Sequence, residues 1–373
     1  MSTFADSAST NRPLAVPMPL ESDAGSPSAN APISLPVNSA HRGAVFYGVE
    51  NTLYAFEKAF DLGATAVELD VVCLSSGELA VFHGGGNHCN PGDVYDLCSL
   101  IEVDDAEHDE MNISGTFGSI GSSGFACSED SYSTTASTQV ADPETSIPVH
   151  SSVQYNEITP NHYFVEEMTL SQVRSLRFTT RSPGFAPLLS TAAEDFEEQV
   201  RKAEVPLLKD VLELCKSRGA RVALEMKGLG VEHGSLRMVE ELGMTDLVTF
   251  SSFHNSRTAL IRRMRSDMSI RTGKIFDEQL PADWIEQCKS THCNEAHVCF
   301  TACTPENMAR AHAAGLYVMA WFPHPQNKEI WSKHTEDAVL YEKVSRSGVD
   351  MMCVNKPDLL KVVHDRMSRE MAA

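Results

Sequence analysis

From about residue 37 onward, short strand-like segments alternate with helix-like segments along most of the chain. Nine segments read as strands because they are short, apolar and rich in branched or aromatic residues. These segments are Val37–His41, Ala66–Val72, Leu79–His83, Val222–Lys227, Leu247–Ser252, Ile270–Phe276, Ala296–Thr301, Tyr317–Phe322 and Asp350–Asn355. Because helical stretches separate most of them, we expect parallel strands joined by right-handed crossovers. The alternation therefore predicts an α/β fold.

The helical stretches follow from apolar periodicity. Residues Glu50–Leu62 place their apolar side chains on one face, and Gly63 ends the pattern. A further helix is expected to open at Val205 and to continue to about Arg218. Strands and helices in this order fit a (β/α)8 TIM barrel.

A barrel of this type has eight strand places, and the sequence offers nine candidates. Either one candidate is not a barrel strand, or the barrel is distorted. Leu79–His83 and Ala296–Thr301 fit the pattern least well.

Two regions interrupt the alternation. Residues 1–36 are rich in Ser, Ala, Pro and Asn without an apolar period, so we expect a disordered tail that is dispensable for folding. Residues 84–204 form a long insertion after the third strand, and residues 84–160 of it are crowded with small polar side chains. The expected domains are the tail, 1–36, and a single barrel domain, 37–373, that contains the insertion.

The charge of the chain limits its partners. The formal net charge is -21 over 373 residues, which argues against a nucleic-acid binder because phosphate backbones are held by clustered Lys and Arg. An anionic small-molecule substrate must therefore be attracted locally, by a metal ion or by a few basic residues. Alternatively, the negative charge only reflects a solvated acidic surface, and we prefer this interpretation for most of the acidic residues.

The sequence also bears on the compartment. It contains no apolar run of about 18 residues that could form a transmembrane helix. The first residues lack the basic-then-apolar pattern of a signal peptide, and the ten cysteines show no close paired spacing. We therefore expect a reduced, cytoplasmic protein; its oligomeric state stays open.

Charged residues gather where the expected strands end. Glu68 and Asp70 are two apart on one strand, so both side chains point to the same side. Glu225 and Lys227 share a face in the same way on another strand. Three converging carboxylates suit a hard cation such as Mg²⁺ or Ca²⁺, which prefers oxygen ligands. The alternative is a structural charge ladder in which Lys227 and Arg42 pair with these carboxylates.

Two histidines are candidates for proton transfer. His41 and His83 each end an expected strand, and histidine titrates near neutral pH. A single histidine at a strand end is usually a structural residue, but two beside a carboxylate cluster favour an acid–base pair. Because parallel barrel strands all end on one face, we expect both histidines on that face.

Several motifs in a fixed order resemble the glycerophosphodiester phosphodiesterase family. The resemblance covers residues 37–360 apart from the insertion. The motifs are His41-Arg42-Gly43, Glu50-Asn51-Thr52, Glu68-Leu69-Asp70, His83, Val205-Pro206-Leu207-Leu208, Glu225-Met226-Lys227, Ser251-Ser252-Phe253, Ala320-Trp321, Gly348-Val349-Asp350 and Asn355-Lys356-Pro357-Asp358.

The resemblance implies a metal-dependent phosphodiesterase on a TIM barrel, and it implies a role for each matching residue. The implied roles are catalysis for His41 and His83, metal binding for Glu68, Asp70 and Glu225, phosphate contacts for Arg42 and Lys227, and further substrate contacts for Glu50 and Trp321.

The chain departs from the family pattern at three places. Gly84 follows His83 where the family has Asp, Val49 stands where it has Pro, and Phe322-Pro323 follow Trp321. These departures concern the substrate more than the chemistry.

Three functions remain open on this basis. The first is hydrolysis of glycerophosphodiesters to glycerol 3-phosphate and an alcohol. The second is phospholipase D-like cleavage of a lysophospholipid or sphingolipid. The third is a barrel that only binds phosphorylated headgroups. A zinc site in the cluster of Cys288, Cys293, Cys299 and Cys303 with His292 and His297 is a weaker alternative, because the spacings are not those of a zinc knuckle or ribbon.

Overall fold

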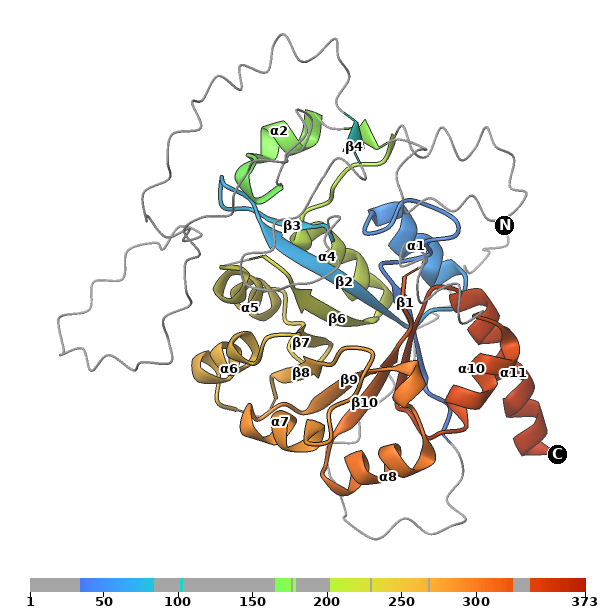
Figure 1. Cartoon of the computed structure of the whole chain (residues 1–373). Helices are drawn as coiled ribbons and strands as arrows, with labels where there is room; N and C mark the ends of the chain where they lie inside the picture. Colours follow the sequence, from blue (N-terminus) through green and yellow to red (C-terminus); the bar gives the residue numbers. More distant parts are fainter. Residues whose placement is uncertain are drawn as a thin grey trace, which may run out of the picture. The chain divides into compact units, whose positions relative to one another are not determined.

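The computed structural model describes residues 34–83, 101–102, 165–175, 177–178, 202–228, 230–267, 269–324 and 336–373. Within them, eight parallel strands form a barrel, and a helix follows each strand on the outside (Figure 1). The strands are β1 (Val37–His41), β2 (Ala66–Cys73), β6 (Arg221–Met226), β7 (Val248–Ser252), β8 (Arg271–Ile275), β9 (Glu295–Cys299), β10 (Tyr317–Trp321) and β11 (Met351–Val354). The helices are α1 (Leu53–Asp61), α4 (Leu208–Arg218), α5 (Val231–Glu241), α6 (Asn255–Met264), α7 (Trp284–Ser290), α8 (Pro305–Ala313), α10 (Ala338–Ser345) and α11 (Pro357–Ala372).

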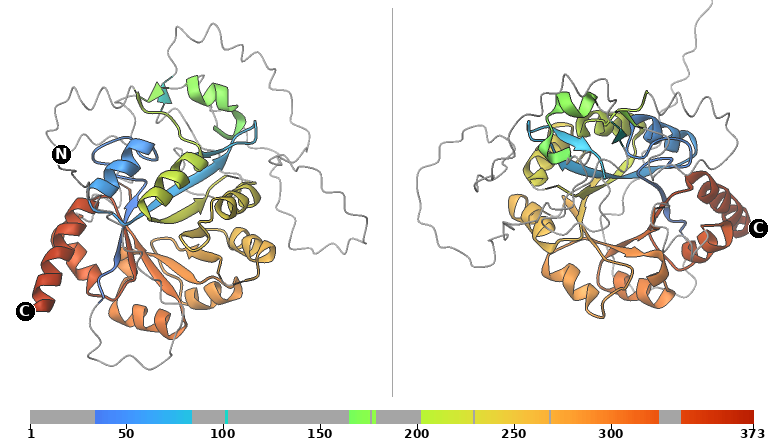
Figure 2. Two further views of the ribbon diagram at one scale, coloured as in Figure 1. Left: turned by 180° about the vertical axis from the view of Figure 1, so that it is seen from behind. Right: turned by 45° about the horizontal axis from the view of Figure 1, so that its top comes forward.

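The barrel closes at its first strand. β1 pairs in parallel with β11 on one side and with β2 on the other, and the remaining barrel strands follow in chain order between them (Figure 2). The predicted (β/α)8 fold is therefore confirmed. The predicted strand at Ala296–Thr301 is real and spans Glu295–Cys299, where a short 3-10 helix, Phe300–Ala302, takes over.

The ninth strand candidate is not a barrel strand. β3 (Leu79–Val81) runs antiparallel to the end of β2, so the two strands form a hairpin that extends beyond the barrel. The turn follows from the polar sequence Ser75-Ser76-Gly77, in which Gly77 has a positive φ of 96°. Among the described barrel strands β3 pairs with β2 alone, and the ring closes through β1 without it, which resolves the excess of candidates.

Little of the insertion is among the described residues. Its described elements are β4 (Ile101–Glu102), a 3-10 helix (Val165–Glu167), α2 (Leu170–Ser175) and β5 (Arg177–Phe178), and β4 pairs antiparallel with β5. Residues 1–33 of the predicted tail lie outside the described ranges, and residues 34–36 lead into β1. The predicted domain boundaries therefore stay predictions. None of the described helices combines the length and the apolar character that a bilayer crossing requires.

The first helix begins three residues later than its apolar pattern suggested. Thr52 is the N-cap of α1, and its hydroxyl accepts a hydrogen bond from the Ala55 amide at 3.2 Å. Asn51 adopts a left-handed conformation with φ 55°, which cannot continue a helix. Glu50 and Asn51 are thereby left outside the helix, where their side chains are available to the barrel interior.

Alternation along β2 separates the two sides of the barrel wall. Leu69 and Val71 pack outward into the large apolar core, where they meet Leu208 and other residues of the surrounding helices. Glu68 and Asp70 point the other way, into the barrel, and both are buried. The helices thus hold the wall in place while the interior is left for polar groups.

Near the N-terminal ends of its strands, the barrel interior contains an ion-pair network centred on Glu295. Its carboxylate accepts hydrogen bonds from Arg271 Nε at 2.6 Å and Thr249 Oγ1 at 2.9 Å. Arg221 Nη2 lies 3.8 Å from the same oxygen, and His297 Nε2 lies 3.0 Å from the other. Burial alone would raise the pKa of Glu295, but His297, Arg271 and Arg221 lower it to about 2. The network therefore stabilises the ionised carboxylate.

This network predicts a specific loss of stability in acid. In the folded protein the pKa of Glu295 is about 2, which lies below the ordinary value of 4.5. The stabilisation by Glu295 is therefore complete above pH 4.5 and is lost as pH falls toward 2. The shift corresponds to a contribution on the order of 3 kcal/mol. Chemical unfolding of Glu295→Gln and the unchanged protein should differ most at pH 7 and converge between pH 4.5 and 2. A difference that does not depend on pH would contradict the assignment.

The cysteines differ from the expectation in one respect. Cys73, the last residue of β2, is disulfide-bonded, whereas we expected a reduced chain. The cysteines that the structure describes as free and buried are Cys215, Cys288, Cys293, Cys299, Cys303 and Cys353. Cys288, Cys293, Cys299 and Cys303 pack in the apolar core around β9 and its neighbouring helices.

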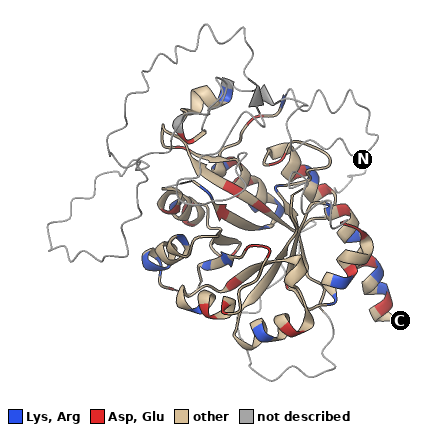
Figure 3. Cartoon of the chain, viewed as in Figure 1, with Lys and Arg blue, Asp and Glu red and all other residues tan. Residues whose placement is uncertain are grey.

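On the outer surface, basic and acidic side chains are interspersed on the last two helices (Figure 3). Arg346 of the turn after α10 lies 2.8 Å from Glu342 and 3.1 Å from Glu370 of α11. These exposed pairs contribute little to stability individually.

Candidate active site

The end of β1 turns sharply so that two polar side chains face the barrel mouth. His41 is the last residue of the strand, and Arg42 adopts a left-handed conformation with φ 58°. Gly43 follows with φ 89°, and a Cβ atom there would lie 2.7 Å from the backbone of Ala55. The Arg42 amide donates to the backbone oxygen of Glu68 at 3.1 Å. A strained backbone at such a place is typical of a functional site, and only glycine fits at position 43.

His83 reaches the same site by a different route from the one the sequence suggested. We expected it to end a parallel barrel strand, but β3 is antiparallel and returns toward the barrel. The Phe82 amide donates to the Asp70 carbonyl at 3.0 Å, which sets the depth of the returning chain. His83 therefore lies beside the end of β2, on the same cavity as His41. The strand that carries His83 is thus antiparallel, and not the parallel barrel strand that we predicted.

Three buried carboxylates converge at the C-terminal ends of β2 and β6. Glu68, Asp70 and Glu225 each offer an oxygen, and these oxygens all lie within 4.8 Å of one another. The exposed fractions of the three residues are 5%, 0% and 8%. Register explains the convergence, because Asp70 is directly opposite Glu225 on the neighbouring parallel strand.

Basic groups partly neutralise this cluster. Lys227 Nζ lies 2.7 Å from Glu225 Oε1 and 3.5 Å from Asp70 Oδ1. Arg42 lies 3.4 Å from Asp70 and 3.1 Å from Glu50. The charge ladder that we considered as an alternative therefore exists. Among the described residues of the site, four buried carboxylates face two basic side chains, and this formal excess of two negative charges equals the charge of one divalent cation. These groups are Glu50, Glu68, Asp70 and Glu225, with Arg42 and Lys227.

The carboxylates also show the signs of a missing counter-charge. Burial and mutual repulsion raise the pKa of Glu68 well above its ordinary value, and burial raises that of Glu225. For Asp70 the effect of burial is outweighed by interactions with His83, Lys227 and Arg42 and by the hydrogen bond from Asn51, which together lower its pKa. Within the described part of the chain, Glu68 Oε1 and Asp70 Oδ1 are buried and accept no hydrogen bond. An all-oxygen set with unsatisfied buried atoms fits Mg²⁺ or Ca²⁺.

Glu50 pairs with both Arg42 and His324. One of its oxygens pairs with Arg42, and the other lies 3.0 Å from His324 Nε2. His324 in turn packs edge-on against His41, with ring centroids 5.7 Å apart. Glu50 does not line the cavity, so it is placed to hold Arg42 and His324 rather than to touch a substrate.

The loop that carries His324 is fixed by a buried polar network. Asn355 donates from its side chain to the Pro323 carbonyl at 2.9 Å and to Glu336 Oε2 at 3.0 Å. Lys356 Nζ donates to the Glu336 backbone oxygen at 3.0 Å. The Asn355-Lys356 motif therefore has a structural function, which is to hold the chain after β10 against the barrel mouth.

Both candidate proton-transfer residues are neutral at neutral pH. Burial lowers the pKa of His83 to about 3, and the charges of Arg42 and Lys227 add to this effect. Burial likewise lowers the pKa of His41 well below 6.5, with a further contribution from Arg42. A neutral imidazole can accept a proton, and an anionic ligand placed between the two rings would raise both pKa values again.

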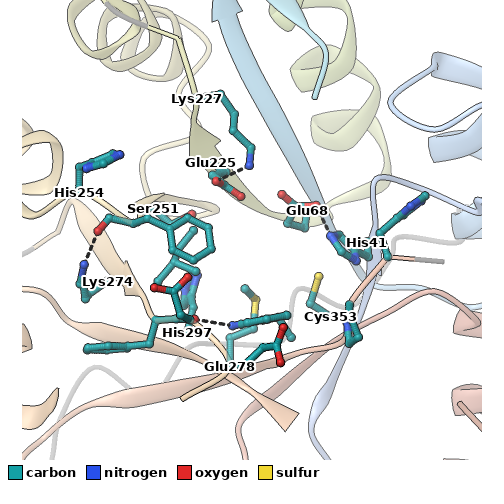
Figure 4. A pocket seen from close by; sticks show the side chains of 18 of the residues that line it. His41, Glu68, Glu225, Lys227, Ser251, His254, Lys274, Glu278, His297 and Cys353 are labelled. Carbon is teal, nitrogen blue, oxygen red and sulfur yellow. Dashed lines mark hydrogen bonds and ion pairs between the residues drawn. The ribbon is translucent and has the colours of Figure 1, made fainter. Parts of the chain in front are cut away.

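The cavity at the barrel mouth has a volume of about 860 Å³. Its lining combines the polar groups described above with apolar side chains from later strands (Figure 4). The sequence-predicted residues on its wall are His41, Arg42, Glu68, His83, Glu225, Lys227 and Trp321. Trp321 offers only its ring, because its indole N–H donates to the Phe276 carbonyl at 3.1 Å. Asp70 and Glu50 lie behind this wall.

Several lining residues had been given no role from the sequence. His324 lies three residues beyond the end of β10, where the rule that functional groups follow barrel strands would have flagged it. Ser251, His297 and Cys353 are inward-facing strand residues. Phe253 follows β7, and its ring packs 5.9 Å from Lys227 Nζ.

Comparison with known proteins gives a family and a fold for this chain. The model of the glycerophosphoryl diester phosphodiesterase family matches residues 41–359. An Oleispira antarctica phosphodiesterase, solved in complex with the product sn-glycerol-3-phosphate, matches with a TM-score of 0.58 at 18% identity over 89% of this chain and 97% of its own. Comparison with curated proteins gives no match.

Two further solved structures give similar values. A glycerophosphodiester phosphodiesterase from Agrobacterium tumefaciens strain C58 has a TM-score of 0.52 at 19% identity over 87% of this chain and 98% of its own. A Galdieria sulphuraria protein assigned to the same activity has a TM-score of 0.56 at 18% identity over 90% and 100%. At these identities the solved structures support the barrel fold, and the family match carries the assignment.

Proposed function

The chain belongs to the glycerophosphoryl diester phosphodiesterase family, and from this premise we propose that it hydrolyses glycerophosphodiesters to glycerol 3-phosphate and an alcohol by metal-dependent His/His acid–base catalysis. The family makes it a phosphoric diester hydrolase. The observation that carries the finer proposal is that His41, His83, Arg42 and Lys227 line one cavity together with the carboxylate cluster.

Glu68, Asp70 and Glu225 would hold a divalent cation, Mg²⁺ or Ca²⁺, in this mechanism. The cation would offset negative charge on the phosphodiester oxygens as the transition state forms. Arg42 and Lys227 would contact the remaining oxygens. Arg42 is suited to a forked contact with two oxygens, whereas Lys227 acts as a point charge. Glu50 would keep the Arg42 guanidinium in place through its 3.1 Å ion pair.

His41 and His83 would carry the protons. One imidazole takes a proton from the nucleophile, either water or a neighbouring glycerol hydroxyl, and the other gives a proton to the leaving alkoxide. Both rings are neutral without substrate, so the acid must gain its proton when the anionic phosphodiester binds. His324, which is paired with Glu50, packs edge-on against the His41 ring, and Glu68 lies 3.8 Å from His41 Nε2.

The direct test is an assay of the purified protein on glycerophosphocholine with EDTA, with Mg²⁺ and with Ca²⁺. We expect glycerol 3-phosphate and choline in equal amounts, and only when a divalent cation is present. Lysophosphatidylcholine and a lysosphingolipid should be included as competing substrates.

The outcomes of this assay separate the three functions. Cleavage of the lysolipids alone would replace the proposal by phospholipase D-like activity. Binding of glycerophosphocholine without any product would indicate a barrel that only binds headgroups. Undiminished activity in EDTA would contradict the role of the carboxylate cluster.

A further inference from the structure

Cys353 lines the cavity but has no part in the mechanism above. It belongs to β11, which pairs with β1 at the closure of the barrel, and it faces inward at the level of Ser39. His41 is the next inward residue of β1 and is directly opposite Glu68 of β2. Three adjacent strands thus bring a thiol, an imidazole and a carboxylate to one point.

The three side chains are close enough to bind one ion. A ligand atom from each of His41, Glu68 and Cys353 lies within 4.8 Å of the other two. The Cys353 sulfur points toward the space between His41 and Glu68 (Figure 4). Cys353 is 1% exposed and Glu68 5% exposed. His41 Nδ1 and Glu68 Oε1 are buried and make no hydrogen bond within the described part of the chain.

The donor set selects a different class of cation from the carboxylate cluster. Mg²⁺ and Ca²⁺ prefer oxygen ligands, and a thiol offers them little. Zn²⁺ and similar thiophilic cations accept sulfur, nitrogen and oxygen, with a fourth position left for water. We propose that His41, Glu68 and Cys353 form a second cation site, specific for thiophilic divalent cations such as Zn²⁺, that shares Glu68 with the Mg²⁺ or Ca²⁺ site.

Binding at this site has a defined proton balance. The Cys353 thiol gives its proton to solvent as the sulfur–metal bond forms, and no redox change occurs. Affinity should therefore rise with pH.

Occupation of this site would block the enzyme, an effect that rests on the function proposed above. The imidazole of His41 cannot take up a proton while its one basic lone pair is bound to a cation, so it can act neither as the base nor as an imidazolium acid. Glu68 is at the same time drawn away from the oxygen-ligand site. Zn²⁺ is therefore an inhibitor of the Mg²⁺-supported reaction, and Cys353 sets its potency.

Binding can be measured without any assay of activity. Co²⁺ added to the reduced protein in the absence of Mg²⁺ should give a near-ultraviolet thiolate-to-cobalt charge-transfer band. The band should be absent in both Cys353→Ala and Cys353→Ser. It should persist in the control Cys215→Ala, which removes another buried free thiol on α4, remote from the cavity. No band in the unchanged protein, or a band that survives both Cys353 changes, would overturn the proposal.

The functional arm is a Zn²⁺ titration at constant Mg²⁺. Removing one ligand should raise the Zn²⁺ concentration for half-inhibition by about 10–100-fold, the range seen when even an indirect partner of a metal site is lost. Activity at zero Zn²⁺ shows that each variant is folded, and using both Ala and Ser at position 353 guards against a packing defect. Equal inhibition of all variants would contradict the site. A Cys353-dependent Co²⁺ band in a protein with no phosphodiesterase activity would refute the proposed function and leave the metal site standing.

Discussion

Changing either His41 or His83 to Ala is expected to lower turnover by about 10²–10⁴-fold, with little change in substrate affinity. In the proposed mechanism each imidazole moves one proton in the transition state, whereas Arg42, Lys227 and the cation would bind the substrate. Steady-state kinetics on glycerophosphocholine would separate kcat from KM. The matched control is His233→Ala, which removes an exposed histidine on α5. Near-full activity in both active-site variants would place the chemistry elsewhere.

The same variants can assign the two roles. A substrate with a very acidic leaving group needs no proton on its alkoxide, so it should restore activity to the variant that lacks the acid. It should not restore the variant that lacks the base. The pH–rate profile of the unchanged enzyme should be bell-shaped, and each variant should lose one limb. Rescue of both variants would show that neither histidine is the base.

Changing Glu68 to Gln is expected to abolish metal-dependent activity while leaving the metal-free fold at least as stable as before. The cation supplies several kcal/mol of transition-state stabilisation, so its loss should reduce turnover by roughly 10²–10⁴-fold. The Glu68 carboxylate is buried beside Asp70 and Glu225, which repel it, and an amide removes that repulsion. The variant should therefore lose activity without losing stability, which distinguishes a loss of function from a loss of folding.

The measurement is thermal unfolding with and without Mg²⁺ or Ca²⁺. At a cation concentration 100 times its Kd, binding to the folded state adds about 2.7 kcal/mol, which should raise the melting temperature of the unchanged protein. Glu68→Gln should show no such rise, whereas the control Glu213→Gln, at an exposed position on α4, should show the full effect. A cation-induced rise in Glu68→Gln equal to that of the control would remove Glu68 from the metal site.

Much of the fold followed from the sequence because alternation and strand length are local properties. Eight of the nine strand candidates became barrel strands with ends shifted by only one or two residues. The ninth, Leu79–His83, was equally apolar, and only its pairing distinguishes a hairpin strand from a barrel strand. Pairing is set by partners far away in the chain, which a local pattern does not reveal.

Site residues could be predicted where a suitable residue type stands at the end of a strand. They could not be predicted where the role depends on how far along the barrel axis the side chain lies. Glu295-x-His297 on β9 has the same spacing as Glu68-x-Asp70 on β2. Glu295 nevertheless lies one layer lower, inside a closed ion-pair network, because its neighbours Arg221 and Arg271 begin their strands. Spacing places two side chains on one face, but register against the neighbouring strands determines whether they reach the cavity.

The seam where β1 meets β2 and β11 has a consequence for how activity is gained during folding. His41 and Glu68 are contributed by the beginning of the barrel, whereas Cys353 and the Asn355 network belong to its end, and Asn38 donates to the Pro357 carbonyl 319 positions away. Such contacts close the longest loops in the chain, and contacts of high sequence separation tend to form slowly. Recovery of activity on refolding should therefore lag behind recovery of helix content. Enzymatic turnover is thus a reporter of ring closure rather than of secondary structure.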